Sequence, residues 1–238
     1  MKHSRVPERS AVCALFFDAG NTLLRMNYGA IAAQLGLHGL HYTPDDVARA
    51  EYRARFRLDP HLAPTASTES RSMAGHYFGY LLEELGITDP ETSGALAEWR
   101  QSYNRPVGLW NQADPEAEGV LRRLRARGLG TGVVSNSNGS VRGILEELGL
   151  AGHLDFILDS TVVGVEKPDP RIFRLALEAA RVAPAEAVYV GDLYSVDVLG
   201  ARGAGLGAIL LDPGGVWGEV DCPVARSLGE AVDLALNL

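Results

Sequence analysis

The stretch CALFFDAGNTLL, residues 13–24, decides the fold of this chain. Its apolar run LFF ends on the carboxylate of Asp18, and the residues AGN then lead to Thr22 and two leucines. A strand buried on both faces reads as a continuous apolar run, and a parallel sheet carries its chemistry at the carboxyl ends of such strands. We therefore expect Asp18 at the carboxyl end of a buried strand. An ordinary turn beginning at Asp18 is the alternative, because Asp, Gly and Asn all favour turns.

Composition and charge restrict the classes of partner. The chain has 238 residues, of which 46% are hydrophobic, and this length accommodates one large domain or a core with a sizeable insert. The formal charge of -8 argues against a protein that binds nucleic acid or an anionic membrane, since such proteins need a basic face. A small anionic substrate therefore needs basic residues placed locally. The sequence carries no signal for the oligomeric state.

Cysteine usage and hydropathy predict a cytoplasmic protein. Cys13 and Cys222 have no metal-ligand spacing, and Cys13 lies in the first apolar run, where a buried inert thiol is expected. The basic start MKHSRVPERS is followed by only a short apolar run. No segment approaches the ~20 apolar residues of a membrane span.

Strand-like and helix-like segments alternate from residue 107 onward. Four β-rich runs, 130–135, 154–160, 187–192 and 207–212, are separated by segments with helical spacing of apolar residues. One of these helices is expected to begin at Asp169 with Pro170 in its first turn, and another at Ser227 with Glu230 completing a capping box. This alternation predicts an α/β fold, a doubly wound parallel sheet with helices on both faces.

Residues 28–105 differ from the rest, because they contain no clear strand and read as about four helices. One of them is expected to begin with a capping box from Thr43 to Asp46. We therefore divide the chain into a core, residues 1–27 and 106–238, and a helical lid inserted at residues 28–105. Hinges are expected near residues 25–28 and 104–108, because closure of a lid excludes water from a reaction.

Polar residues follow four predicted strands and are expected to meet at one edge of the sheet. They are Asp18 after the first strand, Ser135 and Asn136 at the end of the second, Lys167 after the third, and Asp192 and Asp197 after the fourth. Carboxylates gathered at one edge repel each other unless a cation joins them, and Mg²⁺ prefers oxygen ligands. Taken singly, each residue has an ordinary explanation as a cap, a turn residue or a solvated loop residue. Their joint order favours a catalytic site.

The segments DAGNT, VVSN, KPDP and VGDLYSVD resemble the four motifs of the haloacid dehalogenase superfamily, in order and over nearly the whole chain. The helical segment after the first motif resembles the inserted cap of that superfamily. The resemblance implies an aspartate nucleophile and a phosphate site flanked by a lysine and Mg²⁺. The implied residues are Asp18 as nucleophile, Ser135, Asn136 and Thr22 at the substrate, Lys167 as neutralising charge, and Asp18, the Gly20 carbonyl, Asp192 and Asp197 for the metal.

The chain departs from the superfamily's phosphatases at Gly20. Those enzymes carry a second aspartate there, which protonates the leaving alcohol and then activates water. General acid-base catalysis contributes typically ~10²–10⁴-fold. Either another residue, from the lid, supplies the proton, or the leaving group does not need one.

The second option keeps other activities open. The superfamily's 2-haloacid dehalogenases also lack the second aspartate, because a halide leaves without a proton, but they do not use Mg²⁺ and the acidic pair in GDLYSVD is retained here. Its phosphonate-cleaving members use a lid lysine, and residues 28–105 contain none. A catalytically weak member that binds a phosphorylated ligand or a protein partner through the lid is a further alternative.

Three arginines recur every four residues on one predicted lid helix, at Arg49, Arg53 and Arg57. They form either a solvated face, which Asp45 helps to balance, or a face that closes over an anionic substrate; under the second hypothesis Arg49 and Arg53 bind it.

The function we expect is a Mg²⁺-dependent hydrolase of small phosphorylated metabolites that works through an aspartyl-phosphate on Asp18.

Overall fold

The computed structural model describes residues 11–62, 71–103 and 108–237. Its main sheet has six strands in the order β5-β4-β1-β6-β7-β8, and all neighbouring strands are parallel. The strands are β1 (Ala14–Phe17), β4 (Gly130–Ser135), β5 (Phe156–Asp159), β6 (Ala187–Gly191), β7 (Gly207–Leu211) and β8 (Val224–Ala225). The predicted doubly wound α/β fold is confirmed, and each of the four predicted β-rich runs contains a strand.

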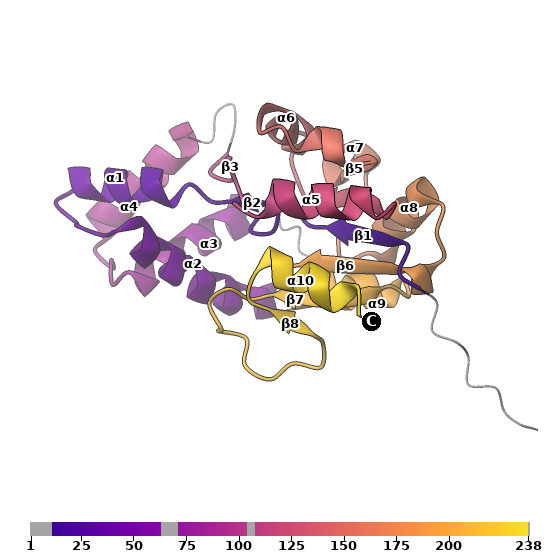
Figure 1. Cartoon of the computed structure of the whole chain (residues 1–238). Coiled ribbons are helices and arrows are strands. Elements are labelled where there is room, and N and C mark those ends of the chain that lie inside the picture. Colours follow the sequence, from indigo (N-terminus) through magenta and orange to yellow (C-terminus); the bar gives the residue numbers. More distant parts are fainter. Residues whose placement is uncertain (1–10, 63–70, 104–107, 238) are drawn as a thin grey trace, which may run out of the picture.

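Helices cover both faces of this sheet (Figure 1). In Figure 1, α5 and α10 lie in front of the sheet, while α8 and α9 lie behind it. The helices and helical turns are α5 (Ala117–Ala126), α6 (Val141–Glu147), η2 (Ala151–His153), α7 (Ser160–Val163), α8 (Pro170–Ala180), η3 (Pro184–Glu186), η4 (Tyr194–Val198), α9 (Leu199–Gly203) and α10 (Leu228–Ala235).

Strand β1 is buried on both faces because its side chains alternate between two cores. Leu15 and Phe17 lie in one core with Leu121 of α5, and Phe16 lies in the other with Phe173 of α8. Cys13, in contrast, is exposed, because the strand begins at the next residue; the expectation of a buried thiol is wrong.

The N-terminal caps predicted for α8 and α10 are both present, but one of them only in part. Asp169 caps α8 by accepting a hydrogen bond from the Arg171 N–H at 2.9 Å, as predicted. Ser227 likewise caps α10, but the carboxylate of Glu230 accepts from the N–H of Arg226 instead of Ser227. The predicted capping box is therefore only half formed.

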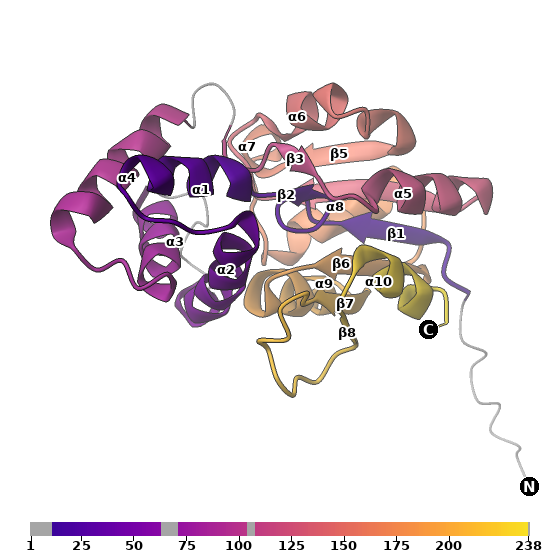
Figure 2. The same cartoon turned by 60° about the vertical axis from the view of Figure 1, so that its left-hand side comes forward.

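The remaining helices pack together as a separate group at one end of the sheet, which we call the helical block (Figure 2). They are α1 (Tyr28–Leu37), α2 (Pro44–Leu58), η1 (Asp59–His61), α3 (Arg71–Glu84) and α4 (Pro90–Tyr103). Residues of the block share an apolar core that includes Leu35, Val47 and Leu81. The predicted capping box from Thr43 to Asp46 begins α2. No strand occurs among the described residues between 28 and 103.

A short antiparallel ribbon joins the block to the sheet. Its strands are β2 (Leu24–Arg25) and β3 (Gln112–Ala113), and Arg25 forms an ion pair with Asp114 at 2.7 Å. The first predicted hinge, residues 25–28, begins within this ribbon, whereas most of the second, residues 104–107, lies outside the described residues. No helix in the described part of the chain is both long and apolar enough to cross a membrane.

Candidate active site

Asp18 lies at the carboxyl end of β1, as its sequence context predicts. Its backbone N–H donates to the carbonyl of Val190 at 2.9 Å, which extends the pairing with β6 by one residue. Strand β1 lies between β4 and β6. After β1 the chain forms β4 and β5 on one side of it and then β6, β7 and β8 on the other, so the direction of strand addition reverses at β1. This reversal is the position at which open α/β sheets bind ligands. Asp18, Ser135 and Asp192 meet there and line one pocket of about 240 Å³.

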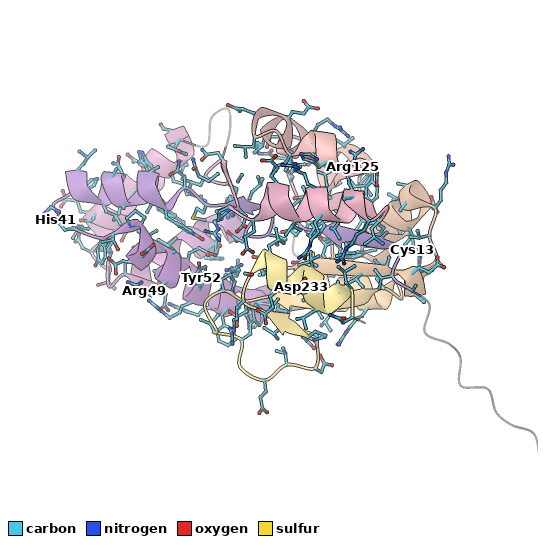
Figure 3. The ribbon with its side chains drawn as sticks, in the orientation of Figure 1. Cys13, His41, Arg49, Tyr52, Arg125 and Asp233 are labelled. Atoms are coloured by element: carbon cyan, nitrogen blue, oxygen red, sulfur yellow. The ribbon has the colours of Figure 1, made fainter. Side chains whose placement is uncertain are left out.

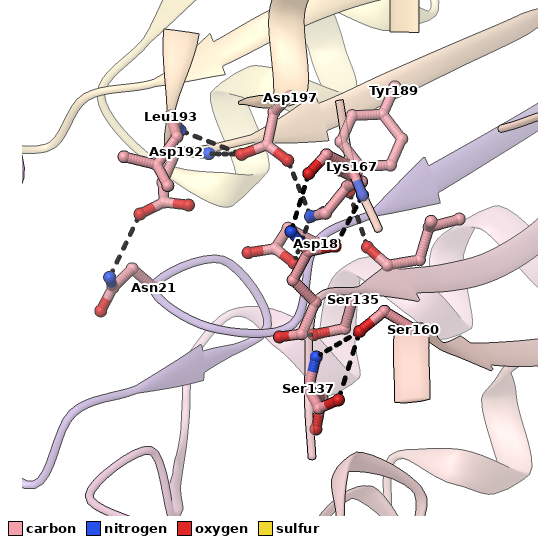
Figure 4. Close-up of polar contacts among 12 residues, drawn as sticks. Asp18, Asn21, Ser135, Ser137, Ser160, Lys167, Tyr189, Asp192, Leu193 and Asp197 are labelled. Carbon is pink, nitrogen blue, oxygen red and sulfur yellow. Dashed lines mark hydrogen bonds and ion pairs between the residues drawn. The ribbon is translucent and has the colours of Figure 1, made fainter. Parts of the chain in front are cut away.

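Lys167 is held rigidly beside Asp18 (Figure 4). Its Nζ donates to Oδ1 of Asp18 at 2.7 Å, to Oδ1 of Asp197 at 2.8 Å and to the hydroxyl of Tyr189 at 2.9 Å. The side chain of Asn136 fixes the lysine backbone, accepting from its N–H at 2.8 Å and donating to its carbonyl at 2.9 Å. Thus all three ammonium protons are used, and Asn136 positions Lys167.

Asp197 supports the loop that carries Asp192. Its Oδ2 accepts from the backbone N–H groups of Asp192 at 3.1 Å and Leu193 at 3.0 Å. A Cβ placed on Gly191 would lie 2.4 Å from Cγ of Asp197, so only glycine permits this approach. Both carboxylate oxygens of Asp197 are therefore committed to Lys167 and the loop.

Burial controls the ionisation of this cluster. Burial raises the pKa of Asp18 to about 7, against the opposing charge of Lys167. The pKa of Asp192 is also raised by burial, although Arg55 opposes that shift. Burial alone lowers the pKa of Lys167, but Asp18 and Asp197 outweigh it and the pKa is raised. The lysine remains a cation, and additional positive charge beside Asp18 and Asp192 would favour their ionised forms.

The donor set fits a hard divalent cation. Oxygen atoms of Asp18, Asp192 and Asp197 lie within 4.8 Å of one another. With Glu51, four buried carboxylates face two buried cations, Lys167 and Arg55. Oxygen ligands and uncompensated negative charge are what Mg²⁺ requires. Gly20, whose carbonyl is a predicted ligand, lines the same pocket.

Arg55 of α2 reaches the site, although the sequence pattern did not single it out. Its Nη1 donates to Oδ2 of Asp192 at 2.8 Å, and only 3% of either side chain is exposed. Glu51, one turn earlier on the same helix, forms the other ion pair with Arg55. A glutamate four residues before an arginine, on a face opposite the regular arginines, is the only sequence signal for this pair.

Arg49 and Arg53, the predicted substrate-binding pair, are not brought to the pocket. Arg49 pairs with Asp46 at 2.6 Å and lies on the outer part of the block (Figure 3). Arg53 pairs with Glu84 at 2.7 Å. About half of each side chain is exposed, 59% and 46%. The physical reason is that carboxylates on the block neutralise both arginines at its surface.

Thr22 also lies apart from the pocket lining. It is fully buried, and its Oγ1 has no hydrogen-bond partner among the described residues. Ser135 lines the pocket, and two of the amide groups that follow it bind side chains: Ser137 N–H donates to Oγ of Ser160, and Gly139 N–H donates to the carboxylate of Asp159. These two amide groups are therefore engaged within the protein and are not free to bind an anion.

An aromatic wall stands beside Gly20. A Cβ on Gly20 would lie 3.4 Å from Cδ1 of Trp110, whose indole stacks on Tyr77 with centroids 5.8 Å apart. The indole N–H donates to Oδ1 of Asn21 at 2.8 Å, and Nδ2 of Asn21 donates to Asp192 at 3.1 Å. Trp110 thus covers the space into which a side chain at position 20 would extend.

Asp18, Lys167 and two further carboxylates thus meet at the switch point of a parallel α/β sheet. A family model described as haloacid dehalogenase-like hydrolase matches residues 13–205. The chain belongs to this family.

Individual proteins agree with that assignment. The chain is 34% identical over 210 residues to human haloacid dehalogenase-like hydrolase domain-containing protein 3, covering 85% of this chain and 83% of the relative. It is 44% identical over 138 residues to a phosphoserine phosphatase of Thermus thermophilus, covering 58% of this chain and 53% of the relative. A solved 2-haloacid dehalogenase of Pseudomonas syringae aligns with a TM-score of 0.57 and 25% identity over 95% of this chain and 98% of that one.

Proposed function

We propose that the protein is a Mg²⁺-dependent phosphatase of small phosphorylated metabolites. The observation that carries the proposal is the arrangement of Asp18, whose Oδ1 is held by Lys167 while Oδ2 has no hydrogen bond within the described chain. A carboxylate with one oxygen fixed and the other directed to a pocket is a positioned nucleophile. The similarity to a phosphoserine phosphatase supports a phosphate ester as substrate.

The reaction follows from these positions. The second oxygen of Asp18 attacks phosphorus, an O–P bond forms, and the bond to the leaving oxygen breaks with its electron pair on that oxygen. Water then attacks the aspartyl-phosphate, which releases phosphate and restores the carboxylate. Lys167 offsets the negative charge of nucleophile and phosphate throughout. Bound Mg²⁺, held by Asp18, Asp192 and the Gly20 carbonyl, would neutralise phosphate charge at the same edge.

The pocket restricts the substrate to a small molecule. Its volume of about 240 Å³ lies at or below the low end of drug-sized sites, ~300–1,000 Å³. The helical block forms one side of it through Arg55, Leu58, Leu62 and Tyr77. In this proposal the block serves as a cap that closes over the substrate and excludes water.

A metal-independent 2-haloacid dehalogenase is the second candidate. Two observations favour it: Gly20 carries no acid, and Arg55 already supplies a cation to Asp192. In that reaction Asp18 displaces halide from carbon, and water hydrolyses the resulting ester. No proton is needed by the departing halide.

One set of assays separates these functions. We expect phosphate release from small phosphate esters that EDTA abolishes and Mg²⁺ restores, and no halide release from 2-haloacids. Asp18→Asn should abolish the phosphate release without unfolding the protein, because it removes the attacking charge but little volume. Halide release that resists EDTA would favour the dehalogenase. The absence of both phosphate release and halide release would favour a ligand-binding or partner-binding protein.

A further inference from the structure

We propose that Arg55 is a positioning residue that weakens divalent-cation binding by competing for Asp192. The inference rests on the proposed Mg²⁺ site. The guanidinium comes from α2 of the helical block, whereas Asp192 follows β6 of the sheet. Metal affinity therefore depends on whether the block is docked.

Arg55 cannot turn away from the site while the block is docked. Its Nε and Nη2 lie 3.3 Å and 3.4 Å from the carboxylate of Glu51, which is completely buried. Glu51 in turn accepts hydrogen bonds from the hydroxyls of Tyr28, at 3.0 Å, and Tyr77. The positive charge beside Asp192 is consequently fixed by a buried network and cannot relax into solvent.

The carboxylate of Asp192 that pairs with Arg55 is also a candidate metal ligand. Oδ2 of Asp192 accepts from Arg55 at 2.8 Å and from Nδ2 of Asn21 at 3.1 Å. Asp192 is also one of the three carboxylates that can hold an ion together. An ion bound to that cluster would lie within a few ångströms of the guanidinium, in a buried site where like charges repel strongly. Arg55 therefore raises the free energy of the metal-bound state.

Loss of thermal stability alone cannot test this role, because removing one partner of any buried ion pair is destabilising. The diagnostic quantity is the affinity for Mg²⁺ without substrate. Arg53 offers a matched control: it lies on the same helix, carries the same charge, and pairs with Glu84 at the surface.

The experiment is titration calorimetry of the full chain with MgCl₂. We expect Arg55→Met, which removes the charge but keeps much of the chain length, to bind Mg²⁺ about tenfold or more tightly than wild type. Arg55→Lys, which keeps the charge, should stay within about threefold, and Arg53→Met within about twofold, since screened surface charges act weakly. Circular dichroism confirms that each variant is folded.

For a second variant, Glu51→Gln, we expect the opposite change in Mg²⁺ affinity. Glu51→Gln removes the negative partner of Arg55 and leaves more uncompensated positive charge beside Asp192, so Mg²⁺ binding should weaken. This variant decides the question if Arg55→Met does not fold, and an unchanged or stronger affinity for Glu51→Gln then overturns the inference.

The remaining outcomes separate the inference from the proposed function. If wild type and Arg55→Met bind Mg²⁺ equally, or Arg55→Met binds more weakly, the competition is disproved while the Mg²⁺ site stands. If neither protein binds Mg²⁺, both the inference and the metal part of the proposed function fail. If only Arg55→Met binds it, the inference is supported.

Discussion

At the scale of single residues, the neighbourhood of Gly20 determines which esters the proposed reaction can cleave. In that reaction Asp18 and Lys167 supply nucleophile and countercharge, but no group at position 20 can protonate the leaving oxygen. Trp110 lies against Gly20 and donates its indole N–H to Asn21. The leaving oxygen must therefore be stable as an anion or take its proton from elsewhere.

We predict that wild type strongly prefers a good leaving group. An aryl phosphate such as 4-nitrophenyl phosphate should exceed a sugar phosphate in the chemical step by up to ~10²–10⁴-fold, the usual contribution of an acid catalyst. Single-turnover rates measure this ratio. Similar rates for both esters would show that another residue already supplies the proton.

Gly20→Asp should reduce that preference by raising turnover of the sugar phosphate. Gly20 does not have a left-handed backbone conformation, so the main chain permits a side chain there, but the new Cβ touches Trp110 at 3.4 Å. Gly20→Asn is the matched control, because it has the same size without the acid. Equal single-turnover rates for the two variants would contradict a missing proton donor.

Some site residues lie at the ends of strands and could be predicted from the sequence, whereas others reach the site only through the tertiary structure. Asp18, Ser135, Lys167 and Asp192 were predictable, because strand ends gather at one edge of a parallel sheet. Arg55 and Tyr77 were not, because they belong to the helical block and reach that edge only through its docking, and Trp110 was not, because it lies in the segment between the block and β3. The regular spacing of Arg49, Arg53 and Arg57 identified an exposed face, and the arginine that reaches the pocket, Arg55, lies between two of them.

At the scale of elements, hydrophobic periodicity predicted the long helices and the buried strands. The two-residue strands β2, β3 and β8 are too short to show any period, so the ribbon that joins block and sheet was missed. The helical turn η4 follows β6. Its π-helical form brings Asp197 back onto the end of β6, and glycine at position 191 makes the approach possible.

This junction gives a stability and activity prediction. Gly191→Ala places a Cβ 2.4 Å from Cγ of Asp197, which must shift and release part of its hold on Lys167. We expect a loss of ~1–3 kcal/mol in unfolding free energy from overpacking, and a fall of ~10²-fold in kcat from the misplaced lysine. Denaturant unfolding and steady-state kinetics measure both.

Gly203→Ala in α9 is the control for the glycine substitution itself. No atom lies within 4 Å of a Cβ at position 203, so this change should be neutral or stabilising by up to ~1 kcal/mol. If Gly191→Ala matched it in stability and kcat, the close approach of Asp197 would have no functional role.

At the scale of the whole molecule, charge links the block to the sheet. The docked site holds an excess of buried carboxylates, and Arg55 pairs with one of them, Asp192. Under the inference above, this arginine opposes a metal ion there. A bound phosphate adds negative charge, which would allow Arg55 and Mg²⁺ to occupy the site together. Docking of the block and binding of Mg²⁺ are therefore expected to be compatible mainly when an anionic substrate is present, which couples closure to recognition.

A reversible crosslink tests that coupling. Oγ of Ser195 lies 2.8 Å from the carboxylate of Asp59, so these two side chains join η4 to the helical block directly. The double variant Asp59→Cys with Ser195→Cys, with Cys13 and Cys222 replaced by serine, should form a disulfide under mild oxidation. With the block locked in place, Mg²⁺ should bind more weakly and kcat should fall, because substrate must enter and product leave past the block. Reductant should restore the Mg²⁺ affinity and kcat, and oxidation should change neither quantity in the single-cysteine variants. A crosslinked protein with unchanged Mg²⁺ affinity and unchanged kcat would mean that the block neither moves nor communicates with the metal site.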